Sequence, residues 1–387
     1  MTEKEQDRLN EAEFSEYLRH VAPSKAEVAW AWGTAIGLQK VDGLTTSEQL
    51  RDTARRNIEG EISIDEAEKI MRSYYITKEK HDNGVDVDEK EGDLASLNIG
   101  RLLQEPTFTF SRAGLQAIHK RIFNGVFKWA GQLRDYEISK KEWVLRGDSV
   151  TYGFSFELEQ AIDYDLQQEK EFSYSGLSIT DTIEHLAKFI AGLWQIHPFG
   201  EGNTRTSAVF LIKYLHQIGF SAENDMFEKY SWYFRNALVR ANYRNVKKGI
   251  EPDTSFLVAF LRNLLLGENN PLHNRHMLVG AKSNLFGKTE QVESRDRTST
   301  EQVDNPLLIG LNDKIRALMG VIDGGELSVK EMMERLSLVH RPTFLENYLD
   351  PALAGKFVTR LYPDSPRHPR QRYLLTVRGY AILQLLK

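Results

Sequence analysis

Apolar residues recur three and four positions apart along most of this chain, which is the spacing of helices that bury one face. Near the N-terminus this spacing predicts helices over 24–39 and 47–57, and a third after Ser63, which forms a capping box with Glu66. The middle of the chain predicts seven more helices, over residues 94–103, 111–123, 156–169, 180–196, 204–218, 232–246 and 255–266. The predicted fold is therefore mainly α.

Three stretches depart from the helical spacing. Residues 77–92 and 282–305 are almost wholly polar, so we expect a surface loop in the first and a linker in the second. Between residues 131 and 153, apolar residues bracket Ser139-Lys140-Lys141 as two short strands bracket a turn. This pattern predicts a β-hairpin on a helical body.

After the linker, the pattern predicts helices over 307–322, 328–336, 342–349 and 351–361, then a strand over 373–377. Helices followed by a basic hairpin describe a winged helix. A chain of 387 residues is expected to form two or three domains. The predicted division is a helical module over 1–76, a central domain over 94–270 and a winged-helix domain over 305–387.

The composition is that of an ordinary globular protein, with 41% hydrophobic and 27% charged residues. The formal net charge of −5 gives no global sign of a nucleic-acid partner, and the absence of cysteine excludes disulfides, thiolate metal sites and a cysteine nucleophile. Residues 1–18 lack the apolar core of a secretory signal, and no apolar run is long enough for a membrane helix. We expect a cytoplasmic protein without a membrane partner.

The most informative stretch lies between two strongly apolar helical segments and reads His197-Pro198-Phe199-Gly200-Glu201-Gly202-Asn203-Thr204-Arg205. Pro198 ends the first helix and so places His197 at its C-terminus. Gly200, Gly202 and Asn203 are residue types that tolerate a positive φ, so consecutive backbone amides can point into one concavity. Asn203 can also cap the next helix, whose N-terminus attracts anions. The stretch therefore predicts a phosphate-binding loop.

Three side chains of this loop offer chemistry. His197 titrates near neutrality and can take a proton from a hydroxyl group. Glu201 offers an oxygen ligand for Mg²⁺, which commonly binds one or two carboxylates together with substrate phosphates, and Arg205 can contact phosphate oxygens. The alternative is a glycine-rich helix connection with a capping Asn and a surface ion pair between Glu201 and Arg205. The convergence of these groups in one short loop favours the functional interpretation.

The loop resembles the signature of the Fic family, HxFx(D/E)GNGRxxR, at His197, Phe199, Glu201, Gly202, Asn203 and Arg205. Members of that family mostly transfer AMP from ATP to a serine, threonine or tyrosine hydroxyl of a target protein. The resemblance implies that His197 is the general base, that Glu201 binds Mg²⁺ and that Arg205 contacts the nucleotide phosphates. The implied nucleotide site comprises Phe199, Gly200, Gly202, Asn203, Thr204 and Arg205, with Tyr233 and Asn236 near the adenine. For these last two, the alternative is a core position, since aromatic residues at helical spacing are more often buried.

Two positions depart from the signature. Thr204 replaces the second Gly, and Ala208 replaces the second Arg, which in the family pairs with the γ-phosphate and receives an inhibitory glutamate. Either another basic residue orients ATP, or the donor differs, such as GTP, UTP or a CDP-linked group. The hairpin at 131–153 resembles the family's flap, whose residues Trp143, Val144 and Leu145 would dock the target beside His197.

Residues 1–76 resemble the small antitoxin module that accompanies Fic domains. In its inhibitory motif, (S/T)xxxE(G/N), Leu38 takes the place of Ser/Thr and Asp42-Gly43 that of Glu and its neighbour. Because the usual Arg and Glu are both replaced, we predict that the module packs on the catalytic body but inhibits weakly, or through another contact. The alternative is that Asp42-Gly43 only ends a helix.

Residues 360–378 are locally basic, with five arginines against the single acid Asp364. The predicted winged helix is a candidate for DNA binding through residues 341–378, although such domains also dock proteins or form homodimers. The leading prediction is a Mg²⁺-dependent protein adenylyltransferase that uses ATP and has an unidentified target. The alternative is a DNA-binding regulator whose Fic domain is weakly active or only binds nucleotide.

Overall fold

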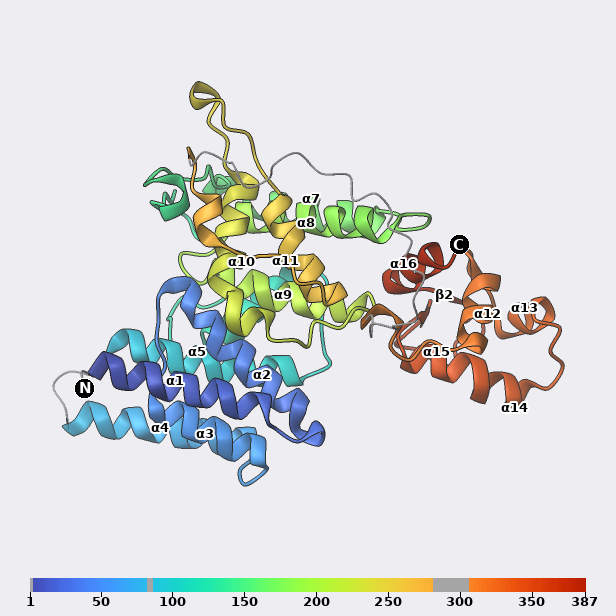
Figure 1. Ribbon diagram of the computed structural model, residues 1–387, viewed down its shortest axis with the longest axis horizontal. Coiled ribbons are helices and arrows are strands. Elements are labelled where there is room, and N and C mark those ends of the chain that lie inside the picture. The colour runs from blue at the N-terminus through green and yellow to red at the C-terminus, as the bar shows by residue number, and fades with distance from the viewer. Residues whose placement is uncertain (1–2, 82–85, 281–305) are drawn as a thin grey trace.

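Helices dominate the computed structural model of the protein, which describes residues 3–81, 86–280 and 306–387, and the mainly α fold that was predicted is confirmed. The N-terminal helices lie at the lower left of Figure 1, the central helices lie above them, and the C-terminal helices project to the right. The N-terminal group comprises α1 (Glu3–Arg19), α2 (Ala26–Gly37), α3 (Glu48–Glu59) and α4 (Ile64–His81). The central group comprises α5 (Val87–Gln104), α6 (Arg112–Ile122), α7 (Leu158–Glu171), α8 (Ile179–Ile196), α9 (Asn203–Gln217), α10 (Met226–Asn242) and α11 (Ser255–Leu266).

Helix α2 belongs to two hydrophobic cores at once. One face, including Trp32, packs with α1, α3 and α4 around Leu50 and Met71. The other face, including Ala35, packs into the core of the central helices. The approach to α10 is close, since a Cβ atom on Gly37 would lie 2.4 Å from the Cα atom of Glu228. The N-terminal helices are therefore built into the body of the protein.

A buried carboxylate links three central helices. The carboxylate of Glu169 in α7 accepts hydrogen bonds from the hydroxyl groups of Tyr174, at 2.5 Å, and of Tyr214 in α9. Its other oxygen lies 2.7 Å from Nε2 of His185 in α8. Because each buried polar group here has a partner, the cluster fixes the packing of α7, α8 and α9.

The predicted β-hairpin at 131–153 is wrong, because these residues, all of which the structure describes, contain no strand. The buried guanidinium of Arg134 lies between the two arms and donates to the carbonyl oxygens of Tyr136, Gly153 and His197. These side-chain bonds hold the arms in place of strand pairing. The loop is irregular and includes a short 3₁₀ turn, η3 (Trp143–Leu145).

The predicted surface loop over 77–92 is largely helical. Helix α4 continues to His81, and α5 begins at Val87, where the Asp86 side chain accepts from the backbone N–H groups of Asp88 and Glu89. Such a cap stabilises a helix start within a polar stretch that carries no apolar periodicity. The predicted linker at 282–305 lies outside the described residues.

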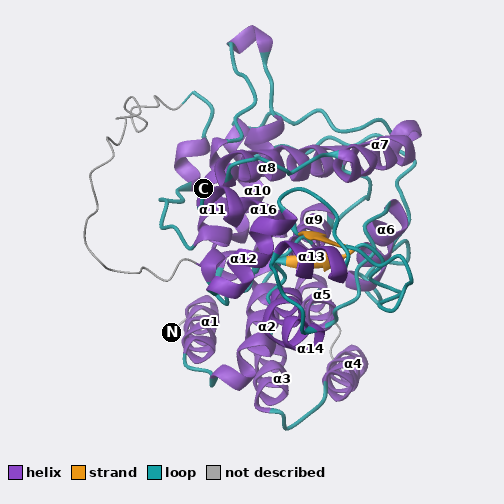
Figure 2. Ribbon diagram, turned by 90° about the vertical axis from the view of Figure 1, so that its right-hand side faces the viewer, coloured by secondary structure: helices purple, strands orange, loops and turns teal. Residues whose placement is uncertain are grey.

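The C-terminal part contains two antiparallel strands, β1 (Val358–Arg360) and β2 (Tyr373–Leu375), shown in orange in Figure 2. Its helices are α12 (Asp313–Ile322), α13 (Val329–Arg335), α14 (Arg341–Phe344), α15 (Asp350–Ala354) and α16 (Val377–Leu385). The helix predicted over 351–361 ends at Ala354, because residues 358–360 pair with β2, and α16 was not predicted. The winged-helix assignment stays a prediction.

Candidate active site

His197 ends α8 in a left-handed backbone conformation, with a φ of 51°. Its backbone N–H donates to the Trp194 carbonyl oxygen at 3.0 Å, and its ring lies 4.2 Å from that of Tyr152. The residue is only 3% exposed. The helix end therefore holds the imidazole in a fixed position beneath the 131–153 loop.

The surroundings of His197 favour a neutral imidazole. Burial lowers the pKa of His197 well below its usual value, and the nearby charges of Lys140 and Arg235 lower this pKa further. Among the described residues, neither ring nitrogen has a hydrogen-bond partner. A neutral ring has a nitrogen lone pair, so it can accept the proton of a hydroxyl group brought beside it.

Between the helices, Gly202 is the residue that the loop requires. Its φ is 76°, and a Cβ atom there would lie 2.1 Å from the ring of Phe123. Gly200 and Asn203, in contrast, have no positive φ. Asn203 does not cap α9 as predicted, since its side chain bonds both the N–H and the carbonyl oxygen of Phe199, at 2.9 and 2.7 Å.

The hydrogen bonds between Asn203 and Phe199 leave the backbone N–H groups of the loop without an acceptor among the described residues. Within the described part of the chain, no acceptor pairs with the N–H groups of residues 200–203. Unpaired amides beside a helix N-terminus form a site for an anion. The phosphate-binding loop stays a prediction, with which these unpaired amides are compatible.

Glu201 faces solvent and pairs with the flap-like loop, since its Oε2 lies 2.8 Å from Nζ of Lys140. The predicted alternative of a Glu201–Arg205 ion pair is therefore wrong. The described residues hold no group of three or more His, Asp or Glu side chains suited to a metal ion. One exposed carboxylate beside a phosphate loop nevertheless fits Mg²⁺, because this ion commonly shares a single protein carboxylate with substrate phosphates.

His119 in α6 supports the loop from below and was not among the predicted site residues. Its Nδ1 accepts from the N–H of Gly131 at 2.8 Å, so the proton is on Nε2, which donates to the Glu201 carbonyl oxygen at 3.1 Å. The ring stacks on Phe199 at 3.8 Å, and burial lowers the pKa of His119 to about 4. A lone histidine in a helical pattern carries no sequence signal of this role.

Arg205 is only 1% exposed and is occupied by groups from outside the loop. Its Nε lies 2.8 Å from an Asp42 carboxylate oxygen, and its NH2 lies 2.6 Å from a Glu91 carboxylate oxygen. The Gln39 side-chain oxygen accepts from NH1 at 3.0 Å. Gly43, with a φ of 74°, ends the 3₁₀ turn η2 (Leu38–Asp42) that carries Asp42. The N-terminal module therefore reaches the signature through Arg205.

Comparison with known proteins agrees with the loop. The pattern of the Fic/DOC family matches residues 109–215, which include the signature, and that of the Fic-like C-terminal domain matches residues 313–376. Residues 109–215 are thus similar to a Fic domain. Within the described residues, none of the helices is long and apolar enough to cross a membrane.

Relatives of this region are distant. The protein adenylyltransferase VbhT of Bartonella schoenbuchensis is 26% identical over 137 residues, which are 35% of this chain and 27% of VbhT. The probable protein adenylyltransferase Fic of Escherichia coli is 27% identical over 119 residues, 30% of this chain and 56% of that protein. A Fic family protein from Desulfovibrio desulfuricans aligns over 97% of both chains with 18% identity and a TM-score of 0.41. The matches to the two curated relatives thus span about half of those proteins or less.

Several predicted site residues lie in the core of the central helices. Of the residues predicted to dock a target, the Val144 and Leu145 side chains are fully buried, whereas Trp143 is 50% exposed. Tyr233 is buried and donates to the Phe256 carbonyl oxygen at 3.3 Å, as its core alternative implied. Asn236 is also buried, with its amide nitrogen 2.8 Å from the Asn274 side-chain oxygen.

The two residues that depart from the signature, Thr204 and Ala208, are both buried in the packed helices. Thr204 accepts a hydrogen bond from the indole nitrogen of Trp194 at 3.0 Å and so joins α9 to α8. Ala208 is fully buried. An arginine at this position would have to leave the core to reach a phosphate.

An ion pair that the sequence did not reveal joins the loop to α10. Arg235 contacts both carboxylate oxygens of buried Glu142, at 2.6 and 3.0 Å. The hydroxyl of Tyr152, whose ring covers His197, lies 3.4 Å from the same carboxylate. The Glu142–Arg235 pair thereby helps to hold the Tyr152 ring over His197.

Proposed function

We propose that this protein is a Mg²⁺-dependent adenylyltransferase that transfers AMP from ATP to a hydroxyl group of a protein. The observation that carries the proposal is the loop at residues 200–203, whose backbone amides have no acceptor among the described residues, beside His197, whose ring nitrogens also lack a partner there. Polyphosphate oxygens would satisfy the amides, and a target hydroxyl would satisfy the imidazole. The names of the two curated relatives agree with this chemistry.

The reaction requires one proton transfer and one displacement. The target hydroxyl oxygen bonds to the α-phosphorus of ATP, the bond from that phosphorus to the bridging oxygen breaks, and pyrophosphate leaves. The hydroxyl proton passes to a ring nitrogen of His197. When bound at Glu201, Mg²⁺ would neutralise phosphate charge. The other contributions are positioning by the loop and exclusion of water by Tyr152 and its neighbours.

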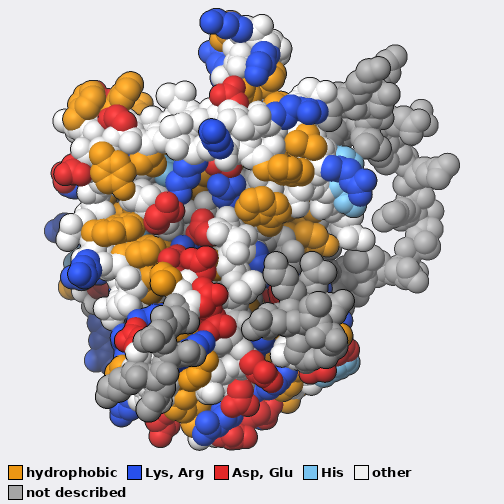
Figure 3. Space-filling view, turned by 90° about the vertical axis from the view of Figure 1, so that its left-hand side faces the viewer, with side chains coloured by type: hydrophobic (Ala, Val, Ile, Leu, Met, Phe, Trp, Pro, Cys, Tyr) orange, Lys and Arg blue, Asp and Glu red, His pale blue; other side chains and the backbone are white. Residues whose placement is uncertain are grey.

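The target would bind along the loop at 131–157, which projects at the left of Figure 1. Its exposed large side chains are those of Tyr136, Trp143, Phe154 and Phe156. Figure 3 views the molecule from this side and shows separate patches of hydrophobic side chains on that face. Exposed aromatic side chains beside a catalytic loop are typical of a protein-binding surface.

The resting protein would be restrained, because Asp42 and Glu91 hold the guanidinium that a donor phosphate needs. With Ala208 in the core, Arg205 is the arginine of the signature that remains. We propose that the N-terminal module regulates transfer through Asp42.

The decisive experiment incubates the protein with Mg²⁺ and each α-labelled nucleoside triphosphate or a labelled CDP-linked donor. We expect label from ATP on the protein itself or on an added lysate protein, and none with His197→Ala. Equal labelling of the two proteins would refute the role of His197. Labelling from another donor alone would identify that donor, rather than ATP, as the substrate. The absence of labelling with every donor would favour the alternative of a DNA-binding regulator.

DNA binding is the second candidate function, favoured by exposed Arg367 and Arg370 between β1 and β2. The rest of the basic stretch contributes less than the sequence predicted. Arg378 is buried and donates to the carbonyl oxygens of Leu307 and Ile309, and Arg372 pairs with Glu331 at 3.3 Å. A mobility-shift titration over a salt series, comparing the parent with Arg367→Ala/Arg370→Ala, tests this function. A parent that does not shift DNA at low salt would remove it.

A further inference from the structure

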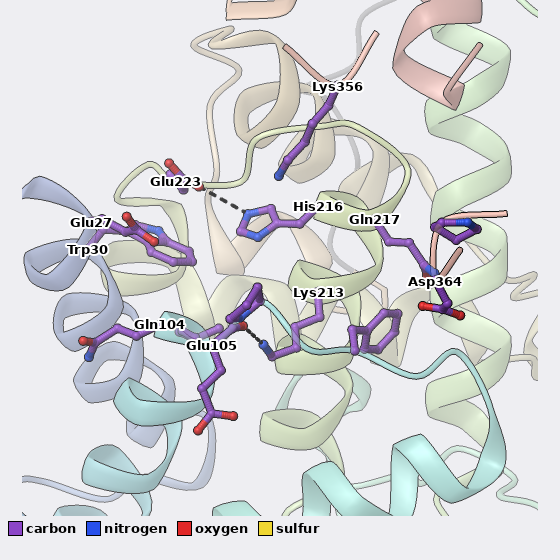
Figure 4. Close-up of a pocket in the computed structure, with 14 residues that line it drawn as sticks. Glu27, Trp30, Gln104, Glu105, Lys213, His216, Gln217, Glu223, Lys356 and Asp364 are labelled. Atoms are coloured by element: carbon purple, nitrogen blue, oxygen red, sulfur yellow. Dashed lines mark hydrogen bonds and ion pairs between the residues drawn. The ribbon is translucent and has the colours of Figure 1, made fainter. Parts of the chain in front are cut away.

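A cavity of about 480 Å³ lies where α2, α9 and the C-terminal domain meet (Figure 4). It is at the opposite end of α9 from the signature loop. Its charged and aromatic lining residues come from all three parts and include Glu27, Trp30, Lys213, His216, Glu223 and Lys356. A ligand here would contact the N-terminal module and the C-terminal domain together.

The lining carries both signs of charge on different sides. Glu27, Trp30 and Glu223 lie on the side of α2, and Lys356 reaches from the C-terminal domain toward His216 (Figure 4). The Nε2 of His216 lies 3.8 Å from a Glu223 carboxylate oxygen, which is too long for a hydrogen bond. The two sides therefore face each other without direct pairing through His216.

Groups of like charge lie close together on each side of the cavity. The pKa of His216 falls to about 4 because of burial and the nearby ammonium groups of Lys356 and Lys213. The pKa of Glu223 is raised by burial and by the neighbouring Glu27, and Lys356 partly offsets this rise. Asp364 also lines the cavity, and Glu105 is engaged by Arg121.

Two residues of the lining each carry a buried nitrogen atom without a partner. Among the described residues, neither Nε1 of Trp30 nor Nε2 of His216 makes a hydrogen bond. The apolar part of the lining includes Leu103 and Phe108 as well as the Trp30 ring.

We propose that this cavity binds a free α-amino acid with an aromatic or large apolar side chain. Its carboxylate would lie between Lys356 and His216, its ammonium would lie between Glu27 and Glu223, and its side chain would pack on Trp30. A simple anion would face Glu27 and Glu223, and a simple cation would face Lys356. A zwitterion satisfies both sides, and the inference does not depend on the proposed transfer reaction.

The test is calorimetric titration of the full chain, without nucleotide, with three compounds that share one ring. These probes are L-phenylalanine, phenylacetate, which lacks the ammonium, and phenethylamine, which lacks the carboxylate. We expect phenylalanine to bind at least about tenfold more tightly than either of the others. Equal binding of phenylacetate or phenethylamine, or no binding of phenylalanine at millimolar concentration, would overturn the proposal.

Variants locate the site. Lys356→Met and Glu223→Gln should each weaken phenylalanine binding about tenfold or more, because each removes one charged contact. Lys330→Met is the matched control, since the Lys330 side chain is 86% exposed on α13 and lies outside the cavity lining. Equal binding by all three variants would place phenylalanine elsewhere and would also overturn the proposal. Melting temperatures of the variants show whether each remains folded.

Discussion

The carboxylate of Asp42 lies 2.8 Å from Nε of Arg205, although the two residues belong to the N-terminal module and to the signature helix. The guanidinium is almost fully buried, and Glu91 contacts it from another side. A buried charge that loses its partners is strongly destabilised. An incoming phosphate must therefore replace these carboxylates rather than simply add to them.

Removing the carboxylates should activate the protein. In Asp42→Ala/Glu91→Gln, Arg205 becomes available to phosphate, and a charge-assisted contact of about 1.5–3 kcal/mol predicts roughly tenfold tighter ATP binding or more. Self-labelling should rise in parallel. The matched control is Asp52→Ala, an exposed position of α3. A folded double variant that labels no faster than the control would contradict regulation through Asp42.

Lys140 should compete with Mg²⁺ for Glu201. Because the Lys140–Glu201 pair is partly exposed, it contributes about 0.2–1 kcal/mol, and Lys140→Ala should lower the half-saturating Mg²⁺ concentration about two- to fivefold at most. The measurement is labelling rate against Mg²⁺ concentration at saturating ATP. Exposed Lys141, mutated to Ala, is the control. If Lys140→Ala instead requires more Mg²⁺, then Lys140 does not compete with the metal.

His119 should make the protein sensitive to acid. Its pKa is about 4 when folded and near its ordinary value of 6.5 when unfolded, so the unfolded state binds the proton first as the pH falls. Stability is therefore lost between pH 6.5 and 4, by at most about 3 kcal/mol from this residue. His119→Phe should keep the stacking on Phe199 and flatten this part of the pH profile.

The readout for His119 is urea denaturation at several pH values. His119→Phe should also slow labelling at pH 7.5, because the Glu201 carbonyl loses its donor. An unchanged pH profile would show that another group is responsible. His20, exposed on the surface and paired with Glu16, offers a control as His20→Phe.

Glu169 should be a large contributor to stability. In Glu169→Ala, the hydroxyl groups of Tyr174 and Tyr214 lose their acceptor in a buried site, which predicts a loss of about 3 kcal/mol in the free energy of unfolding. Glu171→Ala removes an exposed carboxylate from the same helix and should change stability little. Denaturant titration distinguishes the two, and a loss below 1 kcal/mol in Glu169→Ala would contradict the assignment.

Local signals predicted the helices that build the site. The helix predicted over 180–196 is α8, and that over 204–218 is α9, because both have apolar periodicity and sharp ends at Pro198 and Gly219. The loop between them was predicted from Gly200, Gly202 and Asn203, which are residue types that tolerate a positive φ. Its free amides, however, depend on Asn203 bonding Phe199, a choice that spacing does not reveal.

The partners of the site residues could not be predicted, because tertiary packing sets them. The position of Arg205 in the signature predicts a phosphate ligand, yet Asp42 and Glu91 contact it from distant parts of the chain. The resemblance to the family's flap implied that Val144 and Leu145 dock a target, but tertiary packing buries both side chains in the core.

The double role of α2 limits how the restraint on Arg205 can be lifted. A helix that fills two hydrophobic interiors cannot leave without unfolding both, so the N-terminal module cannot dissociate as a separate subunit would. Release of Arg205 from Asp42 would then require a rearrangement of the five residues of η2, at the end of α2. The protein would then switch as a single molecule, at a rate independent of its concentration.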